Sequence, residues 1–108
     1  MKEFLNDFEE MVLTLVATLG DDAYGASINI EIVKWLKRNV TLSALHVTLY
    51  KLEDKGYVKS RIGGATSERG GRSKRSYTIT SAGIATLKGM KEKRIEIWKL
   101  VPQLKFHD

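Results

Sequence analysis

The chain has 108 residues and a net charge of +5, and it contains no cysteine. This length supports one domain with a single modest core, and the lack of cysteine excludes disulfides and thiolate metal ligands. The first residues are acidic where a signal peptide needs positive charge, and the longest apolar stretch, Met11 to Leu19, is too short to span a bilayer. These features predict a cytoplasmic protein.

The excess positive charge lies in the middle and C-terminal parts of the chain. Residues 1–40 hold four Lys/Arg and seven Asp/Glu, residues 41–80 hold eight and three, and residues 81–108 hold six and three. A basic region confined to part of a chain favours a polyanionic partner such as nucleic acid. Because many small domains are mildly basic, charge alone leaves this interpretation open.

Apolar residues at helical spacing predict three helices in the first half of the chain. The first covers about residues 3–19, and the second begins near Tyr24 or Gly25 and ends before Asn39. Thr41 is a good N-cap for a third helix that reaches about Lys55, and Gly56 can take the positive φ that often follows a helix. The apolar stripe expected on this third helix consists of Leu42, Leu45, Leu49 and Leu52.

After Gly56 the apolar period changes from that of a helix to that of a strand. Residues 57–62 and 72–79 predict a hairpin, with Val58, Ser60 and Ile62 on one face of the first strand and Tyr77 and Ile79 facing inward from the second. Since an isolated hairpin is marginal in water, it must pack against the helices. Thr80 or Ser81 then caps a fourth helix, which Pro102 ends or kinks. Its loose apolar stripe is Ile84, Leu87, Met90, Ile97, Trp98, Val101 and Leu104.

The sequence offers no constellation of catalytic or metal-binding residues. His46 has no histidine or acid three or four residues away, and Ser43 lies on the same helix without an acid to complete a triad. The paired glycines are not followed by the Gly-Lys-Ser/Thr of a nucleotide-binding loop. We therefore expect no enzymatic activity, no catalytic residue, no cofactor and no metal.

The second and third helices are separated by a short break, which suits a helix-turn-helix. The face of the third helix opposite its leucines carries short side chains with donors, acceptors and methyl groups, which can approach base edges in a major groove. An ordinary amphipathic helix with a solvated face shows the same pattern. The residues of this face are Ser43, Ala44, His46, Val47, Thr48, Tyr50 and Lys51, with Thr41 at its start.

Positive charge is concentrated where the hairpin turns. Six cations and one acid, Glu68, fall between residues 59 and 75. One or two lysines would protect a sheet edge from aggregation, whereas arginine also offers a planar fork matched to phosphate. Four cations in seven residues are more than protection of a sheet edge requires, and they predict a phosphate-binding arm. Helices followed by such a hairpin are typical of a winged helix. The four cations are Arg69, Arg72, Lys74 and Arg75.

Two motifs resemble those of PadR-type transcriptional regulators. Residues 49–58, LYKLEDKGYV, are similar to the end of that family's recognition helix, and residues 69–83, RGGRSKRSYTITSAG, are similar to its wing. Ala23-Tyr24-Gly25 also resembles the family's entry to the second helix. The resemblance covers about residues 4–100, and the two motifs in register are more specific than either one alone.

The resemblance implies a mostly helical α+β fold, with a winged-helix DNA-binding domain over residues 1–80 and a single C-terminal dimerisation helix over residues 81–108. It implies a homodimeric repressor of transcription that binds double-stranded DNA at an inverted-repeat operator. Some members sense phenolic acids or bind planar hydrophobic drugs, so a small hydrophobic or phenolic effector is a further expectation. The family usually has tyrosine where this chain has His46, which puts that residue's DNA contact in question. Trp98 can either pack in the dimer seam or stack on an effector.

We predict separate roles for the two groups of residues. The cations of the wing would bind the DNA backbone, together with Lys51, and the short side chains of the third helix would read or approach base edges. Two alternatives remain. The basic hairpin could dock on an acidic protein, since a fold does not fix a function. Nonspecific RNA binding is the weaker alternative, because the chain lacks the exposed stacking aromatics usual for single strands.

Overall fold

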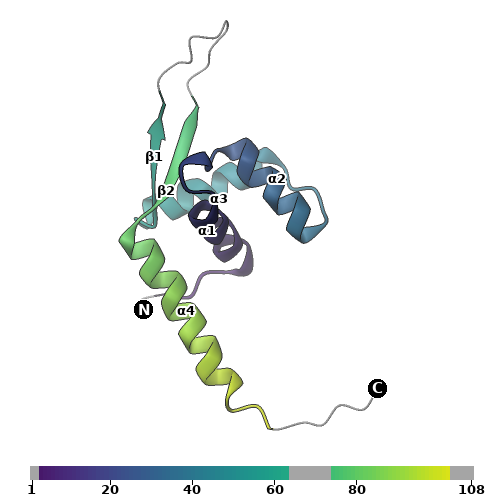
Figure 1. Ribbon diagram of the computed structural model, residues 1–108, viewed down its shortest axis with the longest axis vertical. Coiled ribbons are helices and arrows are strands. Elements are labelled where there is room, and N and C mark those ends of the chain that lie inside the picture. Colours follow the sequence, from purple (N-terminus) through teal and green to yellow (C-terminus); the bar gives the residue numbers. More distant parts are fainter. Residues whose placement is uncertain (1–2, 64–73, 103–108) are drawn as a thin grey trace, which may run out of the picture.

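The computed structural model describes residues 3–63 and 74–102. As Figure 1 shows, the first three helices form the body, the hairpin projects from one end, and the last helix runs away from the other. The predicted α+β, mostly helical class is confirmed. The elements in chain order are α1 (Asp7–Leu19), η1 (Gly20–Asp22), α2 (Gly25–Leu36), α3 (Leu42–Asp54), β1 (Val58–Ile62), β2 (Arg75–Ile79) and α4 (Ser81–Trp98).

Side-chain caps define where the helices begin. The helix α1 starts at Asp7, later than the predicted residue 3, because Asn6 and Glu9 form a capping box with bonds of 2.8 and 3.1 Å. The predicted caps are confirmed, since Thr41 Oγ1 accepts the amide of Ala44 at 3.1 Å and Thr80 Oγ1 accepts that of Gly83 at 3.0 Å. At the other end of α3, Gly56 has the predicted positive φ, at 81°.

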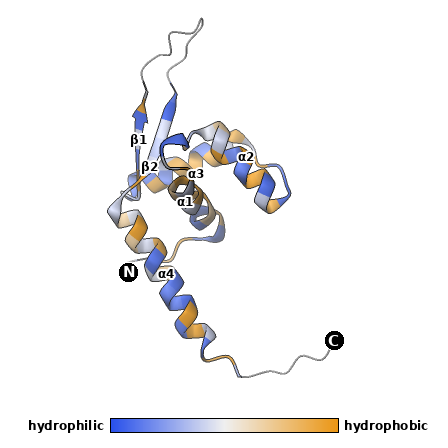
Figure 2. Ribbon diagram, in the orientation of Figure 1, coloured by the Kyte–Doolittle hydropathy of each residue, from blue (hydrophilic) through white to orange (hydrophobic). Residues whose placement is uncertain are grey.

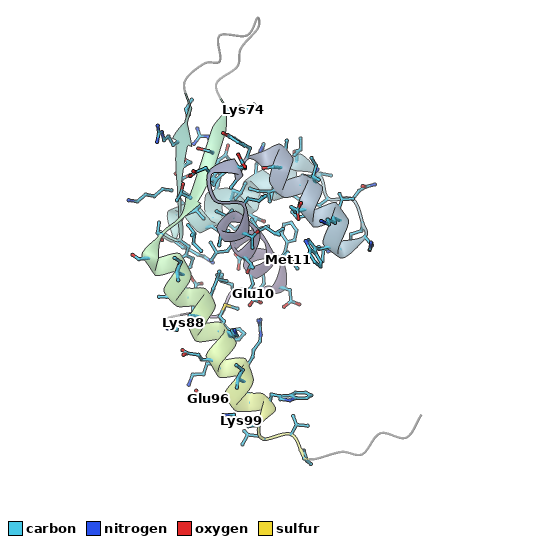
Figure 3. All side chains as sticks on the ribbon, in the orientation of Figure 1. Glu10, Met11, Lys74, Lys88, Glu96 and Lys99 are labelled. Atoms are coloured by element: carbon cyan, nitrogen blue, oxygen red, sulfur yellow. The ribbon has the colours of Figure 1, made fainter. Side chains whose placement is uncertain are left out.

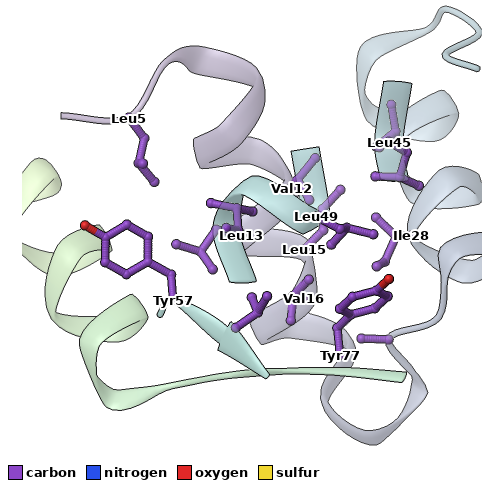
Figure 4. Close-up of a cluster of buried hydrophobic side chains, with 14 of the residues drawn as sticks. Leu5, Val12, Leu13, Leu15, Val16, Ile28, Leu45, Leu49, Tyr57 and Tyr77 are labelled. Carbon is purple, nitrogen blue, oxygen red and sulfur yellow. The ribbon is translucent and has the colours of Figure 1, made fainter. Parts of the chain in front are cut away.

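The core lies where α1, α2, α3 and the base of the hairpin meet. Figure 4 shows Tyr57 and Tyr77 on opposite sides of this cluster of buried apolar side chains. Leu45, Leu49 and Leu52 are fully buried, as predicted, but Leu42 is 50% exposed. Leu42 is the first residue of α3, so it has no preceding turn of the helix beside it. The predicted leucine stripe therefore begins at Leu45.

The hairpin is antiparallel, and its register pairs Val58 with Ile79 and Ile62 with Arg75. Val58 and Tyr77 are buried where the hairpin joins the body, as the alternation predicted for Tyr77, whereas Ile62, at the outer end of β1 and on the same face of the strand as Val58, is 59% exposed. The second strand also bonds to the segment before α2, where the amide of Tyr77 donates to the carbonyl of Ala23 at 2.9 Å. The predicted start of this strand at residue 72 lies outside the described residues.

The buried residues of α4 all lie in the part of the helix up to Met90. Gly83, Thr86 and Met90 are buried, and every residue from 91 to 102 is exposed. Figure 2 shows the exposed half as an alternation of hydrophilic and hydrophobic segments. Ile84, predicted in the apolar stripe, is 53% exposed, and Leu104 lies outside the described residues. Within residues 3–63 and 74–102, none of the helices combines the length and apolar character needed to cross a bilayer.

Gly83 is a position where the fold cannot accept a side chain. A Cβ atom there would lie 2.4 Å from the carbonyl oxygen of Tyr57 and 2.8 Å from Cγ1 of Ile79. Helix propensity alone would make Gly83→Ala stabilising by about 1 kcal/mol. We expect the opposite sign, a loss of about 1–3 kcal/mol in the free energy of unfolding measured in urea, because the backbone must move apart. The control Ala85→Gly, at an exposed position of α4, measures only the effect of helix propensity on the free energy of unfolding. A Gly83→Ala variant that is more stable than the parent protein would contradict the close packing.

Candidate nucleic-acid interface

The outer face of α3 carries most of the side chains that the sequence assigned to it. Ser43, Ala44 and Lys51 are exposed. Val47 and Tyr50 are each about half exposed. Thr41 is also exposed, with its hydroxyl oxygen accepting the cap bond to Ala44. Thr48 departs from the prediction. Only 8% of its surface is exposed, because it lies on the buried side of the helix beside Leu45 and Leu49, so we leave it out of the interface.

His46 lies at the edge of this face, half buried against the start of α2. A Cβ atom at Gly25 would stand only 3.0 Å from Nε2 of His46, so the missing side chain of Gly25 leaves room for the imidazole. The ring of Tyr50, four residues further along α3, has its centroid 6.4 Å from that of the His46 ring. The sequence motif pointed to Gly25 but did not show that it contacts His46.

The described cations of the wing lie at the start of β2. Figure 3 shows Lys74 where the hairpin projects, at the opposite end of the molecule from Lys99. Its Nζ atom lies 5.3 Å from the centroid of the Tyr24 ring, a cation–π distance. Arg75 is exposed and donates to Oγ of Ser60 at 2.9 Å. The other two predicted cations, Arg69 and Arg72, lie outside the described residues.

Two adjacent residues at the start of α2 connect the wing with α3. Tyr24 contacts Lys74 of the wing, and Gly25 contacts His46 of α3. The β-bridge between Tyr24 and Ser76 adds backbone pairing at the same place. The structure therefore brings the start of β2 and the first turns of α3 to the same short segment, although they are far apart in the sequence.

A hydrogen-bonded chain fixes the far end of α3 to the hairpin. Oε2 of Glu53 accepts from the hydroxyl of Ser60 at 2.6 Å and from its amide at 3.3 Å. The hydroxyl oxygen of Ser60 in turn accepts from Arg75. Arg75 is thus held in place from α3, which suits a group that must meet a phosphate at a set position. The predictions from sequence missed Glu53 and Ser60 because they pointed to cations rather than to the groups that orient them.

A second cluster ties the end of α3 to the N-terminal segment. Lys55 Nζ lies 3.2 Å from Glu3 and 3.3 Å from Glu9, and the hydroxyl of Tyr57 donates to Glu3 at 2.7 Å. The bond from Tyr57, with the nearby Lys55, lowers the pKa of Glu3 below its ordinary value of 4.5. This cluster is a structural support, because it lies at the end of α3 away from Ser43 and Ala44.

A groove of about 770 Å³ runs between α1 and α4. It is mostly apolar, with Ala17 from α1 and Ile84, Leu87, Ile95 and Trp98 from α4, and charged residues such as Lys91 and Arg94 also line it. Arg94 crosses between the helices to pair with Glu10 of α1. In the part of the chain that the structure describes, no group of three or more His, Cys, Asp or Glu side chains could hold a metal ion.

The fold is similar to that of several solved transcription regulators. A PadR-like transcription factor from Bacteroides fragilis has a TM-score of 0.71 at 17% identity, with 85% of this chain and 84% of that chain covered. A transcriptional regulator from Clostridium thermocellum has a TM-score of 0.66 at 25% identity, covering 91% and 94%. Bacillus subtilis PadR, solved in complex with operator DNA, has a TM-score of 0.60 at 19% identity, covering 95% of this chain and 52% of that one.

No protein-family model matches the sequence, and no curated protein matches it. The similarity to PadR-like regulators therefore lies in the three-dimensional structure. The chain has the fold of PadR-like transcriptional regulators, which confirms at the level of the fold the resemblance that the two sequence motifs indicated.

The lowered pKa of Glu3 predicts a pH-dependent contribution to stability. Because the folded-state pKa is below the unfolded one, the bond from Tyr57 stabilises the fold above about pH 4.5 and loses that effect as the pH falls through the folded pKa. The destabilisation caused by Tyr57→Phe, measured in urea, should therefore shrink between pH 7 and about pH 3. In a Glu3→Gln background, Tyr57→Phe should lower the free energy of unfolding by the same amount at both pH values. An undiminished cost in the parent protein at low pH would show that the bond is not to an ionised Glu3.

Proposed function

We propose that this chain is a member of the PadR family and a homodimeric, sequence-specific DNA-binding regulator of transcription, acting as a repressor in the cytoplasm. The observation that carries the proposal is the placement of short, exposed side chains on α3 and cations on the wing around the same start of α2. A recognition helix with a flanking phosphate-binding arm is how a winged helix engages a duplex. Bacillus subtilis PadR, which shares the fold, was solved with operator DNA.

In the proposed complex, α3 enters the major groove. Ser43 and Ala44 approach base edges, with His46 at the edge of the contact, and Thr41 stands at its start. Lys51, Lys74 and Arg75 bind phosphate, and Arg69 and Arg72, which lie outside the described residues, extend the phosphate contact along the wing. An acidic protein would also be attracted to these cations, but it would not require the short side chains that α3 presents.

The exposed half of α4 supports a dimer. Ile97 and Trp98, together with Leu100 just beyond the helix, are 60–80% exposed in the single chain, and Trp98 also lines the apolar groove between α1 and α4. Exposed apolar surface of this kind marks an interaction site, and α4 of a second copy is the occupant that the family resemblance implies. We propose residues 81–108 as the dimerisation segment. The part of this segment up to Met90 also packs in the core of the single chain. A planar hydrophobic or phenolic effector would bind beside Trp98 at the same seam.

The proposal is tested by selecting bound sequences from a pool of random duplex DNA. We expect an inverted repeat with half-sites about one helical turn apart, bound in preference to unrelated DNA. If each subunit makes about three to five phosphate contacts, the logarithm of the binding constant should fall with the logarithm of salt concentration at a slope of about −5 to −9. Enrichment of no sequence, or a complex that salt does not weaken, would reject the proposal in favour of an acidic protein partner.

Variants should separate phosphate anchoring from base reading. Lys74→Ala should weaken binding to selected and unrelated duplexes by the same factor and reduce the salt slope, because phosphate contacts carry no sequence information. Ser43→Asn should instead change the order of preference among sequences, measured by fluorescence anisotropy. Lys99→Ala removes an equal charge at the other end of the molecule (Figure 3). Because Lys99 lies in the proposed dimerisation segment, this control is used only after light scattering shows that it has the same oligomeric state as the parent protein, and it should then leave DNA binding almost unchanged. If Lys74→Ala changed the preference and Ser43→Asn weakened all sequences alike, the assigned roles would be reversed.

A further inference from the structure

The first turns of α3 have an unusual composition for a helix that reads bases. Residues 42–50 read LSALHVTLY and contain no Arg, Lys, Asn, Gln, Asp or Glu. Arg or Lys on guanine and Asn or Gln on adenine are the usual side-chain contacts that identify a base. This stretch can make none of them, so its contribution to sequence preference must come from other chemistry.

The exposed groups in this stretch are largely carbon. Val47 is 51% exposed and Ala44 is exposed beside it, while Leu45, Leu49 and Leu52 are fully buried on the other side of the helix. With 3.6 residues per turn, Ser43, Val47 and Tyr50 lie along the line opposite these leucines. Val47 therefore stands at the centre of the outer face, one turn into the helix. Its β-branched side chain is short and stiff, so its methyl groups project at a fixed position.

We propose, on the basis of the proposed function, that Val47 reads the C5 methyl group of a thymine in each half-site, with Ala44 extending the same apolar strip. The thymine methyl is the one apolar group that a base pair presents in the major groove. The strip and the methyl exclude water from each other, which favours A·T over G·C at that position. With 3.6 residues per turn, Ser43 and His46 both lie on the side of Val47 away from Ala44, where they supply the polar contacts beside the strip.

Residues 42–50 contain no Lys, Arg, Asp or Glu, so the methyl contact and the phosphate contacts come from different residues. The cations Lys51, Lys74 and Arg75 lie outside the stretch and would supply the salt-dependent attraction. Loss of the methyl contact should therefore change affinity for particular bases without changing the salt slope. A contact to phosphate would show the reverse behaviour.

Deoxyuridine tests the proposal directly, because it pairs as thymine does and lacks only the C5 methyl group. Using a duplex of the selected sequence, each thymine of both half-sites is replaced in turn by deoxyuridine, and binding is measured by fluorescence anisotropy. At one or two positions we expect affinity to fall about four-fold per half-site, as for one buried methyl group. Val47→Ala should bind the thymine and deoxyuridine duplexes with nearly equal affinity, whereas the control Ile30→Ala, on the exposed face of α2, should keep the full difference.

The outcomes separate this inference from the proposed function. If a preferred sequence is found but no deoxyuridine substitution weakens binding, or Val47→Ala keeps the discrimination, the methyl contact is wrong and DNA binding stands. If selection enriches no sequence, the proposed function fails and the methyl contact fails with it. In that case the exposed valine is more simply explained as part of a protein-binding surface.

Discussion

The complete burial of Leu45, Leu49 and Leu52 fixes the rotation of α3 about its own axis. Each buried leucine contributes about 1.5–3 kcal/mol relative to an exposed one. A rotation of α3 by one residue would expose part of this set and bring polar or charged groups such as Lys51 toward the core. The outer face of the helix is therefore determined by the leucines on the inner face, and the proposed reading of bases depends on that packing.

The relation between α3 and the wing depends on a second set of contacts. At the start of α3, His46 lies against Gly25, next to the residue that meets Lys74. At its end, Glu53 bonds to Ser60, which bonds to Arg75. Close packing of Gly83 against the carbonyl of Tyr57 fixes α4 to the same base of the hairpin. These contacts fix the two described strands of the hairpin relative to α3, which the proposed contact of both elements with DNA requires.

The last helix has two parts with different surroundings. Its first half completes the core through Met90, and its second half leaves Trp98 and its neighbours exposed beside an apolar groove. The proposed division at residue 80 falls just after β2, and Met90 beyond it also belongs to the buried core. This arrangement suits the proposed dimer, in which the exposed end of α4 would contact a second copy while the buried part of α4 stays attached to the body.

The sequence by itself determined the element types, the caps at Thr41 and Thr80, the positive φ of Gly56 and the class of fold, because these follow from local periodicity and from single-residue chemistry. The tertiary structure alone decided which side chains share a surface. Thr48 and Leu42 exchanged their expected roles, since burial depends on what packs beside each turn of a helix and a one-dimensional pattern does not contain that information. The contacts of Gly25 with His46, of Tyr24 with Lys74 and of Ser60 with both Glu53 and Arg75 likewise join separate elements, so only the folded chain could bring them together.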